Sequence, residues 1–439
     1  MRTNRIYKAL SACSLLLLVV SLAMILSGRI GQAGPFVVAC FMLLAIGVRG
    51  WEATKGFSYT IWIFTAVAAS MFYPQYFTAV GSFKLSILIV PLLQIIMFGM
   101  GSQMSLKDFT GVVKMPKSVI IGVAAQFMIM PFIAFSISRI FHFPPEIAAG
   151  IILIGCVPSG LASNVMSYIA HANLPLSVTI GSIATLLSPI MTPLLMKQLA
   201  GQFIEVNVWN MMLDILNMII LPIVAGFIFN LFYSGKETVR AKIIQMSAYF
   251  AILALTSVVD MVSKGSGLGG FLHSLLLSMC WFFIGPIVFS LILRKILKGD
   301  RKVIEQVLSF LSMAGIALII TIITGAGRDS LLSVGALLLI TSLLHNSAGY
   351  ALGYTAAWLF RLPEKDRRTI ALEVGMQNGG LASGLAMQMG KIATVGLAPA
   401  VFGPLMNITG SVLASWWRRK LPEEDRLRAT ATPSNESLS

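Results

Sequence analysis

Charged residues are the scarcest class in this sequence. Asp, Glu, Lys and Arg together make up 11% of the 439 residues, whereas 57% of the residues are hydrophobic. A soluble domain carries about 25% charged residues. The shortage excludes a chain of ordinary soluble domains and indicates a protein whose solvent is a lipid bilayer.

Cysteine and histidine are also rare, with four of each. The cysteines lie inside apolar stretches, no CxxC pair occurs, and no Cys/His cluster has the spacing of a metal site. The sequence has neither an HExxH motif nor a recognisable nucleophile–base pair. These absences argue against a disulfide-stapled domain, a transition-metal centre and an intramembrane enzyme.

What is present is a series of long apolar runs. A bilayer core about 30 Å thick needs about 20 apolar residues per helix, so the chain predicts about fourteen membrane-spanning helices. The basic start is followed by an apolar run too long for a signal peptide, which predicts an uncleaved first helix. The predicted segments are 9–27, 35–49, 57–79, 85–101, 117–139, 146–170, 174–197, 207–233, 243–262, 268–293, 303–324, 331–360, 369–390 and 394–417.

The Lys and Arg residues report orientation. If the segments cross alternately, seven of the 32 basic residues fall on one side, one in each loop, and the other 25 fall on the side of both termini. Basic loops stay in the cytoplasm, so both termini are predicted to be cytoplasmic in a cell (inner) membrane. The same bias explains the net charge of +15 without a nucleic acid partner. Residues 421–439 are predicted to be a disordered cytoplasmic tail, and Trp416 and Trp417 to anchor the last helix at the membrane interface.

Two predicted segments contain residues that a plain membrane helix avoids. The first has GCVPSGLASN at residues 155–164, and the second has EVGMQNGG at residues 373–380. Unwound backbone in a bilayer survives only where it lines a cavity or meets a partner helix. Freed carbonyls coordinate cations and the N-termini of half-helices attract anions. A pair of such interruptions therefore predicts the binding site of a transporter.

Glu373 is the most informative single residue. An intramembrane carboxylate is costly unless it is paired or neutralised, and no Lys or Arg lies at mid-depth in the predicted spans to pair with it. A bound cation or a proton is therefore expected there. Two alternatives remain open: a protonated structural Glu, or a Glu that stays at the interface beside Arg367 and Arg368. Gln126 alone would indicate a hydrogen bond between helices.

The two interrupted motifs, GCVPSGLASNVM at 155–166 and EVGMQNGGL at 373–381, resemble the bile acid:sodium symporter family in its bacterial form. The stretches LSV at 176–178, LHN at 344–346 and NITGS at 407–411 fit the same pattern. The resemblance covers about residues 57–235 and 300–417. It implies an all-α core of ten helices in two inverted five-helix repeats, whose broken helices cross, while about four further helices form two extra hairpins. The expected divisions are an extra N-terminal hairpin at 1–50, the first repeat and the start of the second at 51–235, an inserted hairpin at 236–300, the remainder of the second repeat at 301–420, and the tail at 421–439.

The resemblance also implies two sodium sites made of hard oxygen donors, which suit an alkali cation. Gly181 departs from the pattern, because bacterial members have there a threonine that helps to bind the first sodium. The neighbouring Ser182 points about 100° away on a helix, so the first site is expected to be weakened, absent or completed by water. The first site would use Ser163, Asn164, Ser177 and Glu373; the second would use Gln126, Glu373, Gln377 and the carbonyls of Val374 and Met376; the substrate positions would be Asn378, Asn407, Leu161 and Met406.

These residues predict a secondary active transporter that carries a small organic anion together with sodium by alternating access. Leu161 and Met406 stand where the family has more polar residues, so a more apolar pocket is expected. A bile acid, a keto acid or another carboxylate would fit. The alternatives are a proton-coupled or uncoupled carrier on the same fold, and a receptor that binds the anion without moving it.

Overall fold

The structure is a computed structural model, and it describes residues 2–51, 54, 57–104, 111–234, 239–297, 300–420, 422 and 424–425. Within these residues the chain is almost entirely helical, and the strands are a two-residue antiparallel pair, β1 (Ala79–Val80) and β2 (Phe83–Lys84). Within the described ranges, eleven continuous helical stretches are long and apolar enough to cross a membrane. The predicted class, an all-α protein that spans the membrane many times, is confirmed.

Each predicted segment corresponds to a helix or to a helix with an interruption. Some boundaries differ: the second segment begins at Ile30 rather than 35, and the third ends at Phe72 rather than 79. The third ends early because the chain turns through Pro74 into the short α4 and the β hairpin. The helices are α1 (Arg2–Leu26), α2 (Ile30–Gly47), α3 (Ser58–Phe72), α4 (Gln75–Thr78), α5 (Ile89–Gln103), α6 (Gly111–Lys114), α7 (Pro116–Ile140), α8 (Pro145–Cys156), α9 (Ala162–Ile169), α10 (Leu174–Leu199), α11 (Val208–Ile215), α12 (Leu221–Ser234), α13 (Val239–Lys264), α14 (Gly267–Met279), α15 (Gly285–Ile296), α16 (Arg301–Ala326), α17 (Arg328–Leu359), α18 (Glu364–Gly375), α19 (Gly379–Gln388) and α20 (Leu397–Arg418).

The two interruptions predicted from the sequence separate α8 from α9 and α18 from α19. At the first one, Pro158 lacks an N–H and forces Val157 into an extended conformation (φ −83°, ψ 157°). The second has no proline, and α18 ends where Met376 turns extended (φ −111°, ψ 99°).

The two interruptions meet and bond to each other. Gly160 N donates to Met376 O at 3.0 Å, and Asn378 N donates to Pro158 O at 2.8 Å. Ser159 and Gln377 thereby form an isolated antiparallel bridge. A Cβ at Gly160 would lie 2.9 Å from Gln377 O, so the close approach requires glycine. Each unwound stretch thus satisfies backbone groups of the other, which is the condition for irregular backbone inside a membrane.

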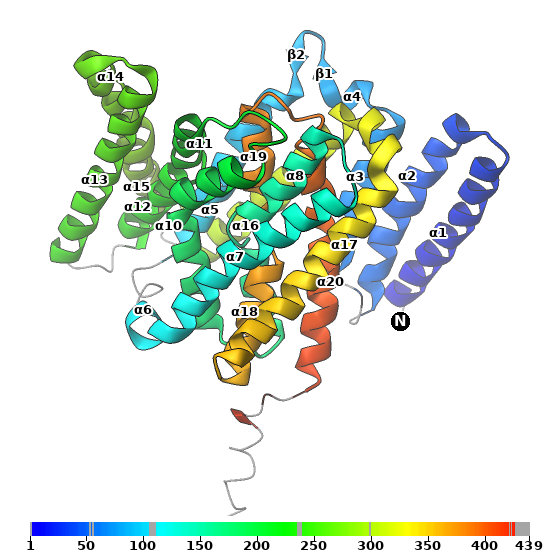
Figure 1. Cartoon of the computed structure of the whole chain (residues 1–439). Helices are drawn as coiled ribbons and strands as arrows, with labels where there is room; N and C mark the ends of the chain where they lie inside the picture. The colour runs from blue at the N-terminus through cyan, green and yellow to red at the C-terminus, as the bar shows by residue number, and fades with distance from the viewer. Residues whose placement is uncertain are drawn as a thin grey trace, which may run out of the picture.

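The helices near this crossing form two groups. The first, which we call the crossing bundle, consists of α7–α10 and α17–α20 and surrounds the unwound stretches (Figure 1). The second, the facing bundle, consists of α3, α5, α11–α12 and α16. Within it, α5 and α12 approach so closely that a Cβ at Gly101 would lie 1.8 Å from Ile223 O. Tyr59 of α3 donates to Met313 O of α16 at 3.0 Å.

Two helical hairpins lie at opposite edges of the molecule (Figure 1). The hairpin of α1 and α2 packs beside α3, and the hairpin of α13 with α14–α15 packs beside α12. That these two hairpins are additions to a family core remains a prediction from the sequence. Many of the described side chains of α1, and four leucines of α14, are apolar and exposed, as expected of helices that face lipid.

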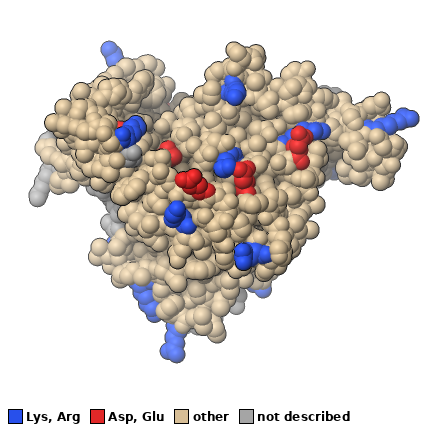
Figure 2. All heavy atoms as spheres, turned by 45° about the horizontal axis from the view of Figure 1, so that its top comes forward, with Lys and Arg blue, Asp and Glu red and all other residues tan. Residues whose placement is uncertain are grey.

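The first helix begins and the last helix ends on the same side of the bundle, which we call the terminal face (Figure 1). Figure 2 tilts the opposite end toward the viewer and shows only scattered charged side chains there. On the terminal face Trp416 is 49% exposed, as an interfacial anchor should be, whereas Trp417 is 7% exposed and stacks on Tyr354. Of the predicted disordered tail, Glu424 and Asp425 are described and contact α18: Lys365 Nζ lies 2.7 Å from Asp425 Oδ1. Residues 426–439 lie outside the described residues.

Candidate ion and substrate site

Glu373 lies in the last turn of α18, directly beside the crossing, and is completely buried. Its carboxylate accepts hydrogen bonds from Ser159 Oγ (2.5 Å) and from Ser177 Oγ. Among the described residues, Glu373 forms no ion pair. Arg368, which could have held it at the interface, pairs instead with Glu364 (2.5 Å). The carboxylate of Glu373 therefore has no basic partner among the described residues, and it faces a buried cluster of oxygen atoms.

That cluster contains a hydroxyl with two acceptors and a single proton. Ser177 Oγ lies 2.8 Å from Asn164 Oδ1 and also contacts Glu373 Oε1. A hydroxyl carries one proton and can donate to only one of two acceptors. With Glu373 ionised, one of these oxygen–oxygen contacts is left without a proton, and either a cation among the three oxygens or a proton on Glu373 would satisfy it. Ser163, the remaining predicted ligand, donates its hydroxyl to Gly160 O at 2.7 Å.

Gln126 contacts Gln377, which lies two residues beyond the end of α18. Gln126 Nε2 donates to Gln377 Oε1 (2.7 Å) and to Val157 O (3.1 Å). Within the part of the chain that the structure describes, Gln126 Oε1 is buried and has no hydrogen-bond partner. A buried carbonyl oxygen without a partner costs free energy of folding. This oxygen lies beside the second predicted sodium site, where it is a free hard ligand.

The carbonyls predicted for the second site are already engaged. Val374 O accepts from Gln377 Nε2 (2.6 Å), and Met376 O accepts from Gly160 N (3.0 Å). Each carbonyl oxygen has a second lone pair, so both atoms can still ligate a cation. The structure therefore brings all the predicted residues of the two sites to the crossing.

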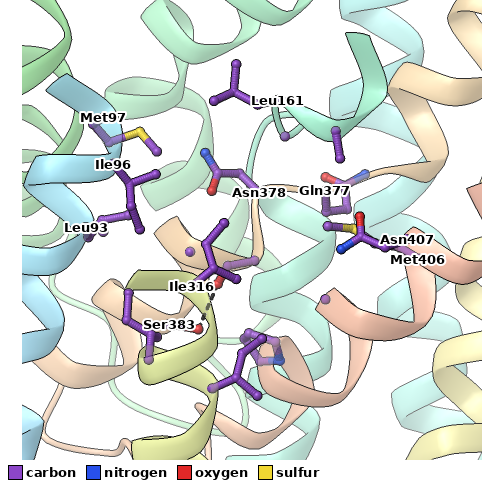
Figure 3. Close-up of a pocket in the computed structure, with 18 residues that line it drawn as sticks. Leu93, Ile96, Met97, Leu161, Ile316, Gln377, Asn378, Ser383, Met406 and Asn407 are labelled. Atoms are coloured by element: carbon purple, nitrogen blue, oxygen red, sulfur yellow. Dashed lines mark hydrogen bonds between the residues drawn. The ribbon is translucent and has the colours of Figure 1, made fainter. Parts of the chain in front are cut away.

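A cavity lies between the crossing and the facing bundle, and all four predicted substrate residues line it (Figure 3). The amide of Asn378 projects into it, and its Oδ1 caps α19 by accepting from Leu381 N (3.0 Å). The first residues of α9 and α19 line the same space, so the positive ends of two half-helices point at it. The opposite wall is apolar, as expected from the sequence. The wall of the crossing bundle contributes Leu161, Asn378, Met406 and Asn407, and the facing bundle contributes Leu93, Ile96, Met97 and Ile316.

Position 181 faces Glu373 and Ser182 points away from it, as the sequence predicted. A Cβ at Gly181 would lie 3.4 Å from Ser159 Oγ and 3.5 Å from Glu373 Oε2, so this position faces the oxygen cluster predicted as the first sodium site. Ser182 instead lines a separate cavity bordered by α5, α12 and α13. It therefore supplies no replacement for a ligand at position 181.

Sequence reasoning missed two residues of the site. Ser159 bonds Glu373, although it stood in the motif without a role. Asn346 donates to Gly375 O at 2.7 Å and so occupies a carbonyl freed at the end of α18. The signal was available for Asn346, because a polar side chain in the long apolar run of α17 needs a partner.

Paired interrupted helices that bond to each other around a buried carboxylate define a class, the secondary transporters with discontinuous helices. The chain belongs to one family of that class, the sodium bile acid symporter family, whose family model matches residues 90–268. It is 32% identical over 392 residues to the uncharacterized sodium-dependent transporter YocS of Bacillus subtilis, a match that covers 89% of this chain and 99% of that protein.

Plant proteins are also similar. The probable sodium/metabolite cotransporter BASS1 of Arabidopsis thaliana, described as chloroplastic, is 29% identical over 332 residues, covering 76% of this chain and 67% of that protein. The probable sodium/metabolite cotransporter BASS2 of rice, also chloroplastic, is 29% identical over 332 residues, covering 75% of this chain and 64% of that protein. The relatives are thus named as sodium-dependent transporters or probable sodium/metabolite cotransporters, and the family predicted from the motifs is confirmed.

Proposed function

We propose that this protein takes up a small organic anion, such as a bile-acid-like molecule, a keto acid or another carboxylate, together with sodium. The observation that carries the proposal is the oxygen cluster at the crossing. Among the described residues it combines a buried carboxylate without an ion-pair partner, a hydroxyl shared between two acceptors, and the unpaired Oε1 of Gln126. Such a set of carboxylate, hydroxyl and amide oxygens suits an alkali cation.

The first sodium would bind Glu373, Ser177 and Asn164, joined by Ser163 and Ser159. The second would bind Gln126 and Gln377 with the carbonyls of Val374 and Met376. Both positions adjoin the unwound backbone, so sodium would draw the two interrupted helices together and complete the wall of the substrate cavity. The anion would then dock at the N-termini of α9 and α19, beside Asn378 and Asn407.

Alternating access would follow from movement of the crossing bundle against the facing bundle, because the cavity lies between them. The inward sodium gradient would drive uptake. The basic residues on the terminal face favour a cytoplasmic position for both termini in the cell membrane. In this proposal the two edge hairpins are additions to a ten-helix core of inverted repeats.

The test is the thermal stability of the purified protein in sodium and in potassium at equal ionic strength. A cation that binds only the folded state stabilises it by RT ln(1 + [L]/Kd), which is about 1.4 kcal/mol when the concentration is ten times Kd. We expect a sodium-specific rise for the wild type, loss of the rise for Glu373→Gln, and a normal rise for the control Glu146→Gln. Glu146 pairs with Lys391 at the other end of the crossing bundle.

Transport is then measured in proteoliposomes with a bile acid, a 2-keto acid and pantoate as probes. Uptake that follows an imposed sodium gradient and fails in Glu373→Gln supports the proposal. Uptake that follows a proton gradient instead identifies the competing proton-coupled carrier, which the glycine at position 181 favours. An equal sodium response of wild type and Glu373→Gln refutes the assignment of Glu373.

A further inference from the structure

A second cavity of about 920 Å³ lies between α17 and α20 and reaches the terminal face. It shares no lining residue with the substrate cavity. Its long wall is apolar, formed by Ile408, Val412 and Leu413 of α20. Val412 is 57% exposed, so this groove opens sideways to the surroundings of the helix bundle.

The mouth of the groove is positively charged. Lys420 stands there with its Nζ 4.1 Å from the centre of the Trp416 ring. Among the described residues Lys420 has no carboxylate partner, whereas the buried Arg368 at the floor is neutralised by Glu364 (2.5 Å). Arg418 and Arg419 precede Lys420 and are exposed. The charge available to a ligand is therefore that of Lys420, reinforced by its neighbours.

From this combination we infer that the groove holds one anionic phospholipid, with its phosphate at Lys420 and an acyl chain along Val412. A soluble anion would use the charge but gain nothing from the apolar, sideways-open wall. A neutral lipid would use the wall but not the charge. Trp416 and Tyr354 line the same groove, and such amphipathic rings sit at the headgroup level of a membrane. The inference rests on the proposed cytoplasmic position of the terminal face, whose leaflet carries the anionic lipids.

The deep end of the groove is connected to the crossing. Thr409 lines the groove and donates to Asn346 Oδ1, and Asn346 in turn holds Gly375 O (2.7 Å). Tyr350, also in the lining, donates to Met406 O at 3.3 Å. A lipid seated here therefore contacts the side chains that position the second interruption, and its presence should change the transport rate.

The experiment uses native mass spectrometry of the full-length protein with added phosphatidylglycerol or phosphatidylcholine. We expect the wild type to retain one phosphatidylglycerol and much less phosphatidylcholine. Lys420→Gln should weaken retention of phosphatidylglycerol roughly fivefold, the effect of one basic residue at an anionic surface. Ala351→Trp, which fills the groove, should abolish it. The matched control is Lys242→Gln, because Lys242 also lies over an aromatic ring, Phe232 at 5.6 Å, outside the groove.

Equal loss of phosphatidylglycerol in Lys420→Gln and Lys242→Gln would overturn the inference, because the surface as a whole would then bind the lipid. Equal retention of phosphatidylcholine would overturn it as well. A third arm adds inorganic phosphate. If phosphate displaces the lipid at millimolar concentration, the site binds a free anion and not a phospholipid, and the inference is overturned. Sodium-dependent stability of each variant reports that it is folded, and this separates failure of the lipid site from failure of the proposed sodium coupling.

Discussion

Adding a hydroxyl at position 181 should strengthen sodium binding. A Cβ there would lie 3.4 Å from Ser159 Oγ and 3.5 Å from Glu373 Oε2, which is ordinary van der Waals contact, so a side chain can be accommodated. In Gly181→Thr the Oγ1 extends one bond beyond this Cβ, into the oxygen cluster of the first proposed sodium site. The substitution therefore adds a hard ligand without displacing an existing one.

The expected size of the effect follows from one added polar contact to a charged group. Such contacts contribute about 1.5 kcal/mol net, and 1.4 kcal/mol is about tenfold in an equilibrium constant. The sodium concentration that gives half of the maximal thermal stabilisation should therefore fall about tenfold. The assay is a sodium titration of the unfolding midpoint, with potassium replacing sodium to keep the ionic strength constant.

Gly181→Val is the matched control, because it has the shape of threonine without the oxygen. Both variants change helix propensity and fill the same space, so any difference between them reports the hydroxyl. If Gly181→Thr and Gly181→Val respond to sodium alike, position 181 does not face a sodium site and the proposed geometry is wrong.

Three further predictions concern the second site, the substrate cavity and the facing bundle. Gln126→Leu should reduce the sodium-dependent stabilisation and lower stability in potassium by about 1–3 kcal/mol, since its partners are left unpaired; a sodium titration measures both. Asn378→Asp keeps an oxygen that can cap α19 but places a negative charge in the cavity. Because that charge repels the anion, the anion concentration for half-maximal uptake should rise at least tenfold, whereas the sodium titration of the unfolding midpoint should stay normal. Gly101→Ala forces α5 and α12 apart at Ile223 O and should cost about 1–3 kcal/mol, measured as a lower unfolding midpoint with the sodium-specific rise intact.

The interrupted segments were predictable because the residues that break a membrane helix are rare and local. Pro158 removes a donor and restrains its predecessor, and polar side chains in an apolar run of 20 residues need partners. Glu373 was identified for the same reason. In each case the free-energy cost belongs to a single residue in an apolar run, so it can be recognised from the sequence alone.

Pairing between distant residues was not predictable in the same way. The bridge joins Ser159 to Gln377, and the bond from Ser159 to Glu373 joins segments that are 214 positions apart. In a membrane protein both the lipid-facing and the buried sides of a helix are apolar, so hydrophobic periodicity says little about which side of a helix contacts other helices. The orientation of Gly181 toward Glu373 and of Ser182 away from it therefore rested on helix geometry and a family resemblance.

The polar contacts at the two ends of α18 bear on which part of the molecule would move in the proposed transport cycle. At its first turn, Asp366 accepts from Ser118 of α7 (2.6 Å) and from Asn173 (2.8 Å), and Arg368 donates to Ala170 O (3.1 Å). At its last turn, Glu373 is held by serines from the first interruption and from α10. A helix fixed at both ends to the same bundle cannot bend without breaking several buried hydrogen bonds, each of which would leave an unpaired polar group.

Across the substrate cavity, by contrast, the side chains of α5 and α16 that line the cavity are apolar, and apolar contacts have no preferred direction. Sliding of the crossing bundle as one body against the facing bundle is therefore the motion that this structure opposes least, and sodium bound at the crossing would travel with it.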